Sequence, residues 1–165
     1  MQFRKALPTV RAILTGTLLL GLSTWPAVGA TVSVTGELVV ADRQSGVALF
    51  GFDPVSYFVK GEAEIGSERI ELSFAGYAWR FRSEANRAAF RSQPDAYVPH
   101  FGGYDPIALG RGAPVSGNPQ LFVVHDGRIY LFQKPEHRVS FLAAPQTAIE
   151  AARANWPHAR KSLVH

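Results

Sequence analysis

The chain of 165 residues contains no cysteine, and its single methionine is Met1. Without cysteine there are no disulfide bonds, no thiolate catalysis, no thiol redox exchange and no metal site built on cysteine sulfur. The lack of any internal methionine excludes thioether ligands as well. The fold must therefore rest on ordinary packing, for which the sequence supplies 11 Phe, 5 Tyr and 3 Trp.

Acidic residues are absent from residues 1–30. The basic residues of this segment stand near its start: Arg4, Lys5 and Arg11. An apolar run over 12–22 follows, and small residues lead to Ala30. This pattern predicts a signal peptide over 1–30 that is cleaved after Ala30, and hence a periplasmic or secreted protein. Because no charge lies between Arg11 and Glu37, an uncleaved membrane anchor remains the alternative.

A strong net charge is also absent once the predicted signal peptide is set aside. The whole chain has 17 Lys+Arg and 13 Asp+Glu, a net charge of +4. Three of the basic residues belong to 1–30, so residues 31–165 carry a net charge of +1. This balance argues against a nucleic-acid partner, and it predicts membrane contact only if the signal segment stays uncleaved.

Runs of apolar and β-branched residues predict an extended lead-in and two pairs of strands: 31–41, 68–74 with 78–82, and 121–124 with 129–132. The last pair flanks Asp126-Gly127. An Asp-Gly pair between two such runs is a strong signal for a β-hairpin, because both central residues of its turn need a positive φ.

Capping residues predict the helices. Asp53-Pro54 and Asp105-Pro106 each combine a favoured N-cap with a proline suited to the first helical position, so each begins a short helical turn. Ser83 caps a longer helix that ends at Pro94. Two more helices close the chain, from Pro135 to before Pro145 and from Pro145 to about Trp156, where Pro157 stops it.

The order of strands, helix, hairpin and helices predicts an α+β fold with a small antiparallel sheet. We expect a single compact domain over 31–157, followed by a C-terminal tail over 158–165. No internal repeat is apparent in the sequence.

Several segments resemble exported bacterial YHS domain proteins: 47–58 (VALFGFDPVSYF), 79–87 with Phe90 and 94–97, 101–104 (FGGY), and the hairpin around Asp126-Gly127. Together they cover about residues 46–135. The resemblance implies a compact α+β module that handles a metal. In that family the presumed metal residue is a cysteine shortly after the Gly-Gly pair, and this chain has Asp105 there.

A carboxylate in that place favours a harder divalent cation or an imidazole partner over copper(I). Since Gly102-Gly103 allows a tight reversal, His100 and Asp105 are the predicted metal ligands. Tyr57 and Tyr104 are predicted to present hydroxyl groups to a bound ligand. As alternatives, Asp105 is only a helix cap and His100 only a loop residue, because two ligands do not complete a metal site.

The favoured function is thus a periplasmic accessory protein that binds a metal or small ligand without catalysis. The alternative is a module that docks on another envelope protein and lacks the metal role. The hypothesis of an enzyme has the weakest support, because the sequence has neither the Gly-x-Ser-x-Gly motif of a hydrolase nucleophile nor a P-loop. Among the other histidines, His125 should face Arg128 across the hairpin, and His137 and His158 should lie at the surface.

Overall fold

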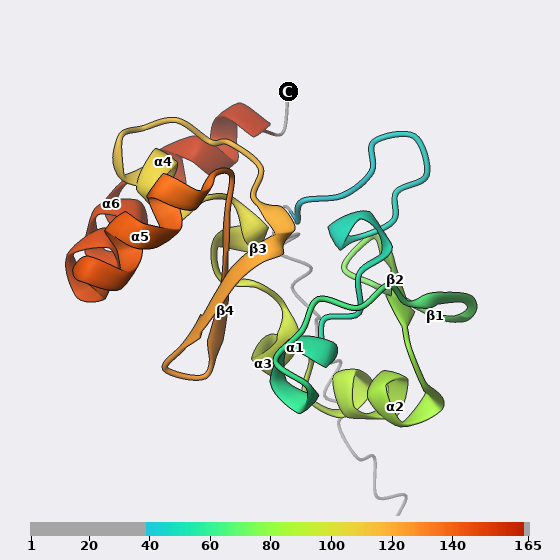
Figure 1. Cartoon of the computed structure of the whole chain (residues 1–165). Helices are drawn as coiled ribbons and strands as arrows, with labels where there is room; N and C mark the ends of the chain where they lie inside the picture. Colours follow the sequence, from blue (N-terminus) through green and yellow to red (C-terminus); the bar gives the residue numbers. More distant parts are fainter. Residues whose placement is uncertain (1–38, 164–165) are drawn as a thin grey trace, which may run out of the picture. The chain divides into compact units, whose positions relative to one another are not determined.

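The fold is set by a strand–strand–helix pattern that occurs twice along the chain (Figure 1). The computed structural model describes residues 39–163, which lie in one compact unit of the chain. Each copy consists of two antiparallel strands and a helix: β1 (Ser67–Phe74), β2 (Tyr77–Phe81) and α2 (Glu84–Ser92), then β3 (Asn118–His125), β4 (Arg128–Phe132) and α5 (Pro135–Ala143).

Each of these three elements begins and ends 51 residues after its counterpart. The correspondence extends to the turns: Ala75 and Gly76 have positive φ angles, as do Asp126 and Gly127. The expectation that the chain has no internal repeat is therefore wrong. We call residues 47–97 the first repeat and residues 99–163 the second repeat.

Short elements precede and follow each hairpin: η1 (Leu49–Gly51), α1 (Ser56–Val59) and α3 (Pro94–Tyr97) in the first repeat, and η2 (His100–Gly103), α4 (Pro106–Gly110) and α6 (Pro145–Leu163) in the second. The turns at η1 and η2 have the same shape, but their residues, like Asp53 and Asp105, correspond at a spacing of 52 rather than 51, because the second repeat has one residue fewer between this turn and its hairpin. The φ angles of Leu49, Phe50 and Gly51 are 50°, 52° and 88°. Those of their counterparts, Phe101, Gly102 and Gly103, are 53°, 63° and 87°.

The predicted fold class is confirmed, since helices and two small antiparallel sheets make up the described chain. The strands form two separate two-stranded sheets, however, rather than one. The cap at Ser83 is present, because its side chain accepts a hydrogen bond from the Asn86 N–H at 3.1 Å. The hairpin turn at Asp126-Gly127 also forms as predicted, with φ angles of 48° and 68°, and His125 pairs with Arg128 across it.

Strand β4 joins the two hydrophobic cores because its side chains alternate between them. Ile129 and Leu131 pack into the core of the first repeat, together with Trp79, Phe81 and other buried residues. Tyr130 and Phe132 face the other way, into a core formed within the second repeat. Both faces of this strand are therefore buried, and the two repeats share it as a common wall.

The predicted helix end at Trp156 is wrong. Helix α6 continues to Leu163 and contains Pro157. Proline lacks the N–H that an interior helical residue donates, so it normally weakens a helix. Here Ala159, beyond the proline, is buried in the core of the second repeat, and this packing extends the folded domain past residue 157 into the predicted tail.

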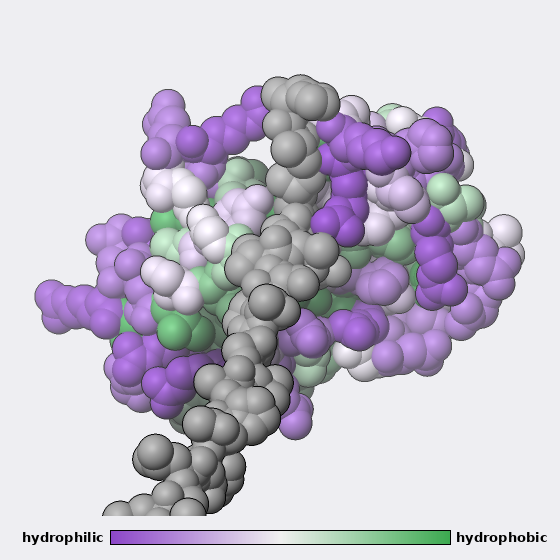
Figure 2. Space-filling model, turned by 180° about the vertical axis from the view of Figure 1, so that it is seen from behind, coloured by the Kyte–Doolittle hydropathy of each residue, from purple (hydrophilic) through white to green (hydrophobic). Residues whose placement is uncertain are grey.

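The predicted signal peptide and most of the predicted lead-in strand lie outside the described residues. Of that lead-in, Val39 and Val40 are buried, and Ala41 forms an isolated bridge with Ala48. Within residues 39–163, no helix is long and apolar enough to cross a membrane. Figure 2 shows, on the face it presents, strongly hydrophilic residues projecting around paler and hydrophobic ones.

Candidate functional site

Asp53 is a buried carboxylate that ties three parts of the first repeat together. Its side chain is fully buried. Oδ1 accepts the Val55 N–H at 2.8 Å, which holds the turn that leads into α1. Oδ2 accepts the Arg82 N–H at 2.6 Å and the Asn86 amide at 2.7 Å, linking the end of β2 to α2. The prediction that Asp53 is the N-cap of this helix is wrong, because α1 begins at Ser56 with Val55 as its N-cap and no side-chain cap bond. Asp53 instead holds the preceding turn, and its second oxygen binds a hairpin and helix about thirty residues away.

Asp105 makes the corresponding bonds in the second repeat. Oδ1 accepts the N–H groups of Ile107 and Ala108 at 2.8 and 3.2 Å, which caps α4 as the sequence predicts. Oδ2 accepts the Gln133 N–H at 2.7 Å and lies 2.6 Å from Nδ1 of His137. Both oxygens of this fully buried side chain are therefore engaged inside the repeat.

His137 is buried, with 6% of its surface exposed, so the prediction of a surface histidine is wrong. It lies 51 residues after Asn86, at the same position of α5 as Asn86 in α2, and both side chains reach the buried aspartate of their own repeat. An amide cannot act as a general base at neutral pH, yet Asn86 makes the same contact as His137. The shared contact is therefore a structural one that joins helix to turn in each repeat.

The structure gives His100 a different set of neighbours from Asp105. Its ring centroid lies 4.2 Å from that of Phe101 and 5.3 Å from that of Tyr130. Burial, together with the positive charges of Arg128 and Arg153, lowers the pKa of His100 from 6.5 to about 4. The imidazole is thus neutral at physiological pH and sits among rings, whereas the Asp105 carboxylate is bound by His137.

The two predicted ligand-binding tyrosines also have structural partners. The Tyr57 hydroxyl donates to the carbonyl oxygen of Pro119 at 3.0 Å, and the residue is 2% exposed. Burial and the charge of Asp53 raise its pKa further above its ordinary value. Tyr104 is half-buried and packs against Trp156 with ring centroids 5.9 Å apart. Neither residue lines the pocket described below.

No group of three or more histidine, aspartate or glutamate side chains within residues 39–163 is arranged to hold a metal ion. The internal bonds of Asp105 leave both of its oxygens occupied by the fold itself. Metal binding by His100 and Asp105 stays a prediction that the contacts of these residues do not support.

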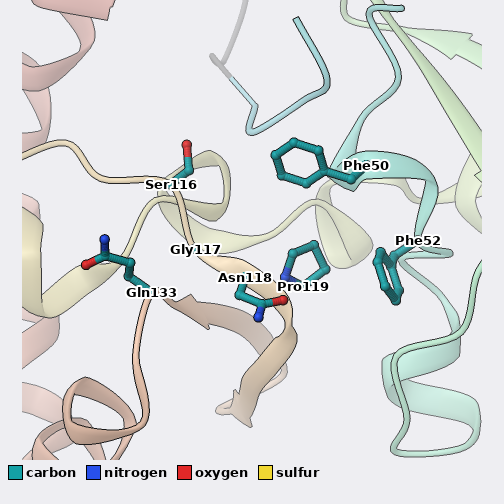
Figure 3. Close-up of a pocket in the computed structure, with 7 residues that line it drawn as sticks. All are labelled: Phe50, Phe52, Ser116, Gly117, Asn118, Pro119 and Gln133. Carbon is teal, nitrogen blue, oxygen red and sulfur yellow. The ribbon is translucent and has the colours of Figure 1, made fainter.

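An open pocket of about 410 Å³ lies where the two repeats meet (Figure 3). The first repeat contributes two aromatic residues, and the second contributes the chain around the start of β3 and the end of β4. The lining residues are Phe50, Phe52, Ser116, Gly117, Asn118, Pro119 and Gln133. None of these seven residues, all in the described part of the chain, carries a charge.

Phe50 is the unusual residue of this pocket. It has φ 52° and ψ 28°, a left-handed conformation that costs a residue with a side chain about 1–2 kcal/mol. Its ring is nevertheless 47% exposed, and Figure 3 shows it directed from its loop toward the segment that carries Ser116. At the corresponding position the second repeat has Gly102, which adopts φ 63° without this cost.

None of the predicted site residues lines this pocket, although the sequence holds one signal for it. The two Asp-Pro pairs are each preceded by a turn, FGF in the first repeat and GGY in the second. Aligning these turns places Phe50 against Gly102 and marks it as an aromatic residue in a place that suits glycine.

Comparison of the chain with protein-family models, with curated proteins and with solved structures found no match.

Proposed function

We propose that this protein is a YHS-like accessory protein of the cell envelope that binds a small ligand without catalysis. Its ligand site is the pocket between the two repeats, with Phe50 as the main contact. The envelope location rests on the signal pattern of residues 1–30, and the family on the sequence resemblance alone.

The exposed and strained Phe50 carries this proposal. Residues held in unfavourable backbone conformations are concentrated at functional sites, where the surrounding structure keeps them in place. The exposed half of the Phe50 ring contributes nothing to folding, and Gly102 demonstrates that the same turn forms without an aromatic side chain. The aromatic residue is therefore best explained by something that it contacts from outside.

The pairing of Asp105 with His137 supports a non-catalytic role. A buried carboxylate that orients a histidine is a common part of catalytic and metal sites. In this fold, however, Asn86 takes the place of the histidine in the first repeat and makes the same bond to Asp53. The arrangement is thus required by the repeat, and catalysis is not needed to account for it.

A second candidate is an interaction with another envelope protein, and the surface beside the pocket favours it. Ile65 is 54% exposed and forms an isolated antiparallel bridge with Phe52. Because Phe52 lines the pocket, Ile65 adds an exposed apolar side chain beside it. Apolar side chains gathered in this way at a surface are typical of protein contacts.

Mapping by amide NMR tests the proposed function. The purified chain is titrated with phenol as a neutral probe, benzoate as an anion and benzylammonium as a cation, each to millimolar concentration. We expect the neutral probe to shift the amide signals of Gly117 and Asn118, and Phe50→Gly to abolish the shifts. If no probe perturbs these amides, the pocket is not a ligand site.

The variant Phe50→Gly, together with Ile65→Ser, distinguishes the second candidate, a contact with another envelope protein, from the small-ligand proposal. An envelope protein that is retained by the parent chain, and by Phe50→Gly, but lost from Ile65→Ser would place a protein contact beside the pocket. In that outcome the small-ligand proposal does not account for the exposed surface.

A further inference from the structure

The pocket contains polar groups as well as aromatic ones, and the polar groups are all uncharged. Ser116, Asn118 and Gln133 are exposed residues that line it. They offer a hydroxyl and two carboxamides, so both donors and acceptors are available to a ligand. No lining residue offers a counter-charge to an ionised ligand, whose desolvation would then go uncompensated.

Two of these polar residues are held in place by backbone bonds. Oδ1 of Asn118 accepts the Gln120 N–H at 2.9 Å, and its Nδ2 group is a hydrogen-bond donor. The N–H of Gln133 donates to the buried Asp105 at 2.7 Å, which fixes the backbone from which its side chain extends. Asn118 and Gln133 thus extend from backbone that is held in place, which lowers the entropic cost of ordering them around a ligand.

The apolar side of the pocket is equally well supported. Pro119 is buried, and its carbonyl oxygen accepts the Tyr57 hydroxyl from the core of the first repeat. Phe50 lies in the η1 turn and Phe52 directly follows it. The backbone of this turn is fixed by two hydrogen bonds, from the Gly51 N–H to the Ala48 carbonyl and from the Phe52 N–H to the Leu49 carbonyl. Figure 3 shows these rings and Pro119 on the side of the pocket away from Gln133.

A ligand that fits must offer an apolar face to the rings and several uncharged hydroxyl or amide groups to the other side. A pyranose ring has both, because its C–H groups form apolar faces and its hydroxyls project from the edge. The volume of about 410 Å³ is within the range of small-molecule sites. We infer that the pocket binds a neutral saccharide, with a ring face on Phe50 and hydroxyls bonded to Asn118 and Gln133. This inference rests on the proposed ligand site at Phe50.

Calorimetric titration with defined sugars tests the inference. Maltotriose, cellotriose and N,N′-diacetylchitobiose are the neutral probes, and glucuronic acid and glucosamine are the charged ones. We expect at least one neutral sugar to bind, and the charged sugars to bind at least tenfold more weakly. Gln133→Met, which keeps the length of the side chain and removes its hydrogen bonds, should weaken that binding about three- to tenfold.

Gln120→Met is the matched control, because Gln120 is an exposed glutamine on the same hairpin that does not line the pocket. Its affinity should equal that of the parent chain. Equal weakening by both glutamine variants, or tighter binding of a charged sugar, overturns the inference. If phenol shifts the pocket amides and no neutral sugar binds, the saccharide inference fails and the proposed ligand site stands. If neither class of probe acts at the pocket, both fail.

Discussion

Nδ1 of His137 lies 2.6 Å from Oδ2 of Asp105, in the place where Nδ2 of Asn86 lies 2.7 Å from Oδ2 of Asp53. Both nitrogens are the δ atoms of their side chains, so asparagine and histidine reach the carboxylate with the same geometry. This equivalence explains why a feature that resembles part of a catalytic site is present in a chain for which we propose binding alone.

The first prediction concerns this equivalence. His137→Asn should preserve the bond to Asp105 and cost less than about 1 kcal/mol, as the first repeat shows that asparagine suffices. His137→Ala should cost about 2–3 kcal/mol, because it leaves the buried carboxylate short of one donor. Chemical denaturation of the two variants measures the difference. Equal losses would mean that the hydrogen bond to Asp105 is not what His137 contributes.

The second prediction concerns the aspartates themselves. Asp53→Ala and Asp105→Ala should each lower the free energy of unfolding by about 2–4 kcal/mol, since each leaves several buried donors without an acceptor. Asp95→Ala is the control, because Asp95 is exposed and should change stability by no more than about 0.5 kcal/mol. A tolerated substitution at either buried aspartate contradicts the structural role described above.

Much of this arrangement follows from local sequence signals. The Asp105-Pro106 cap, the Ser83 cap and the Asp126-Gly127 turn each act on residues within a few positions of themselves, so they could be predicted from the sequence. At Asp53-Pro54 the turn forms, but the helix begins two residues later than predicted. What the sequence did not show is where the second oxygen of each aspartate bonds. That depends on how a turn meets a helix about thirty residues away.

The repeat was missed for a related reason. Its matched positions share size and polarity more than identity, as in Trp79 with Tyr130 and Asn86 with His137. Two residues of different type can fill matched core positions, because a core requires apolar side chains of about the right volume rather than particular residues. The end of α6 was also misplaced, because the burial of Ala159 outweighs the local effect of Pro157.

The third prediction concerns two glycines that pack directly against the second strand of their repeat, Gly66 against β2 and Gly117 against β4. A Cβ atom on Gly66 would lie 2.5 Å from the backbone carbon of Arg80, and one on Gly117 would lie 2.4 Å from Cβ of Leu131. Gly66→Ala and Gly117→Ala should therefore each destabilise the chain by about 3 kcal/mol or more. Gly127→Ala, whose Cβ meets nothing within 4 Å, should cost only its backbone strain of about 1–2 kcal/mol. Thermal unfolding orders the three variants, and a reversed order contradicts the close approach.

The fourth prediction concerns pH. Because the pKa of His100 falls from 6.5 to about 4 on folding, the unfolded chain binds an extra proton between these values. His100 therefore opposes folding increasingly as pH falls from about 6.5 to 4, and has no such effect above that range. In His100→Gln the loss of stability over this interval should be smaller than in the parent chain. Exposed His158→Gln is the control, and an identical pH profile for all three chains would contradict the burial of His100.

The most direct test of the account is the substitution Phe50→Gly. Glycine relieves backbone strain of about 1–2 kcal/mol. This gain is offset by about 0.5–1 kcal/mol from the greater freedom of glycine in the unfolded chain, and by about 1 kcal/mol from the lost burial of half the ring. The free energy of unfolding should therefore stay within about 1 kcal/mol of the parent value. Binding of the neutral probe, followed by the amide signals of Gly117 and Asn118, should be lost. Retained binding with a large loss of stability would mean that Phe50 serves the fold, and would contradict the account.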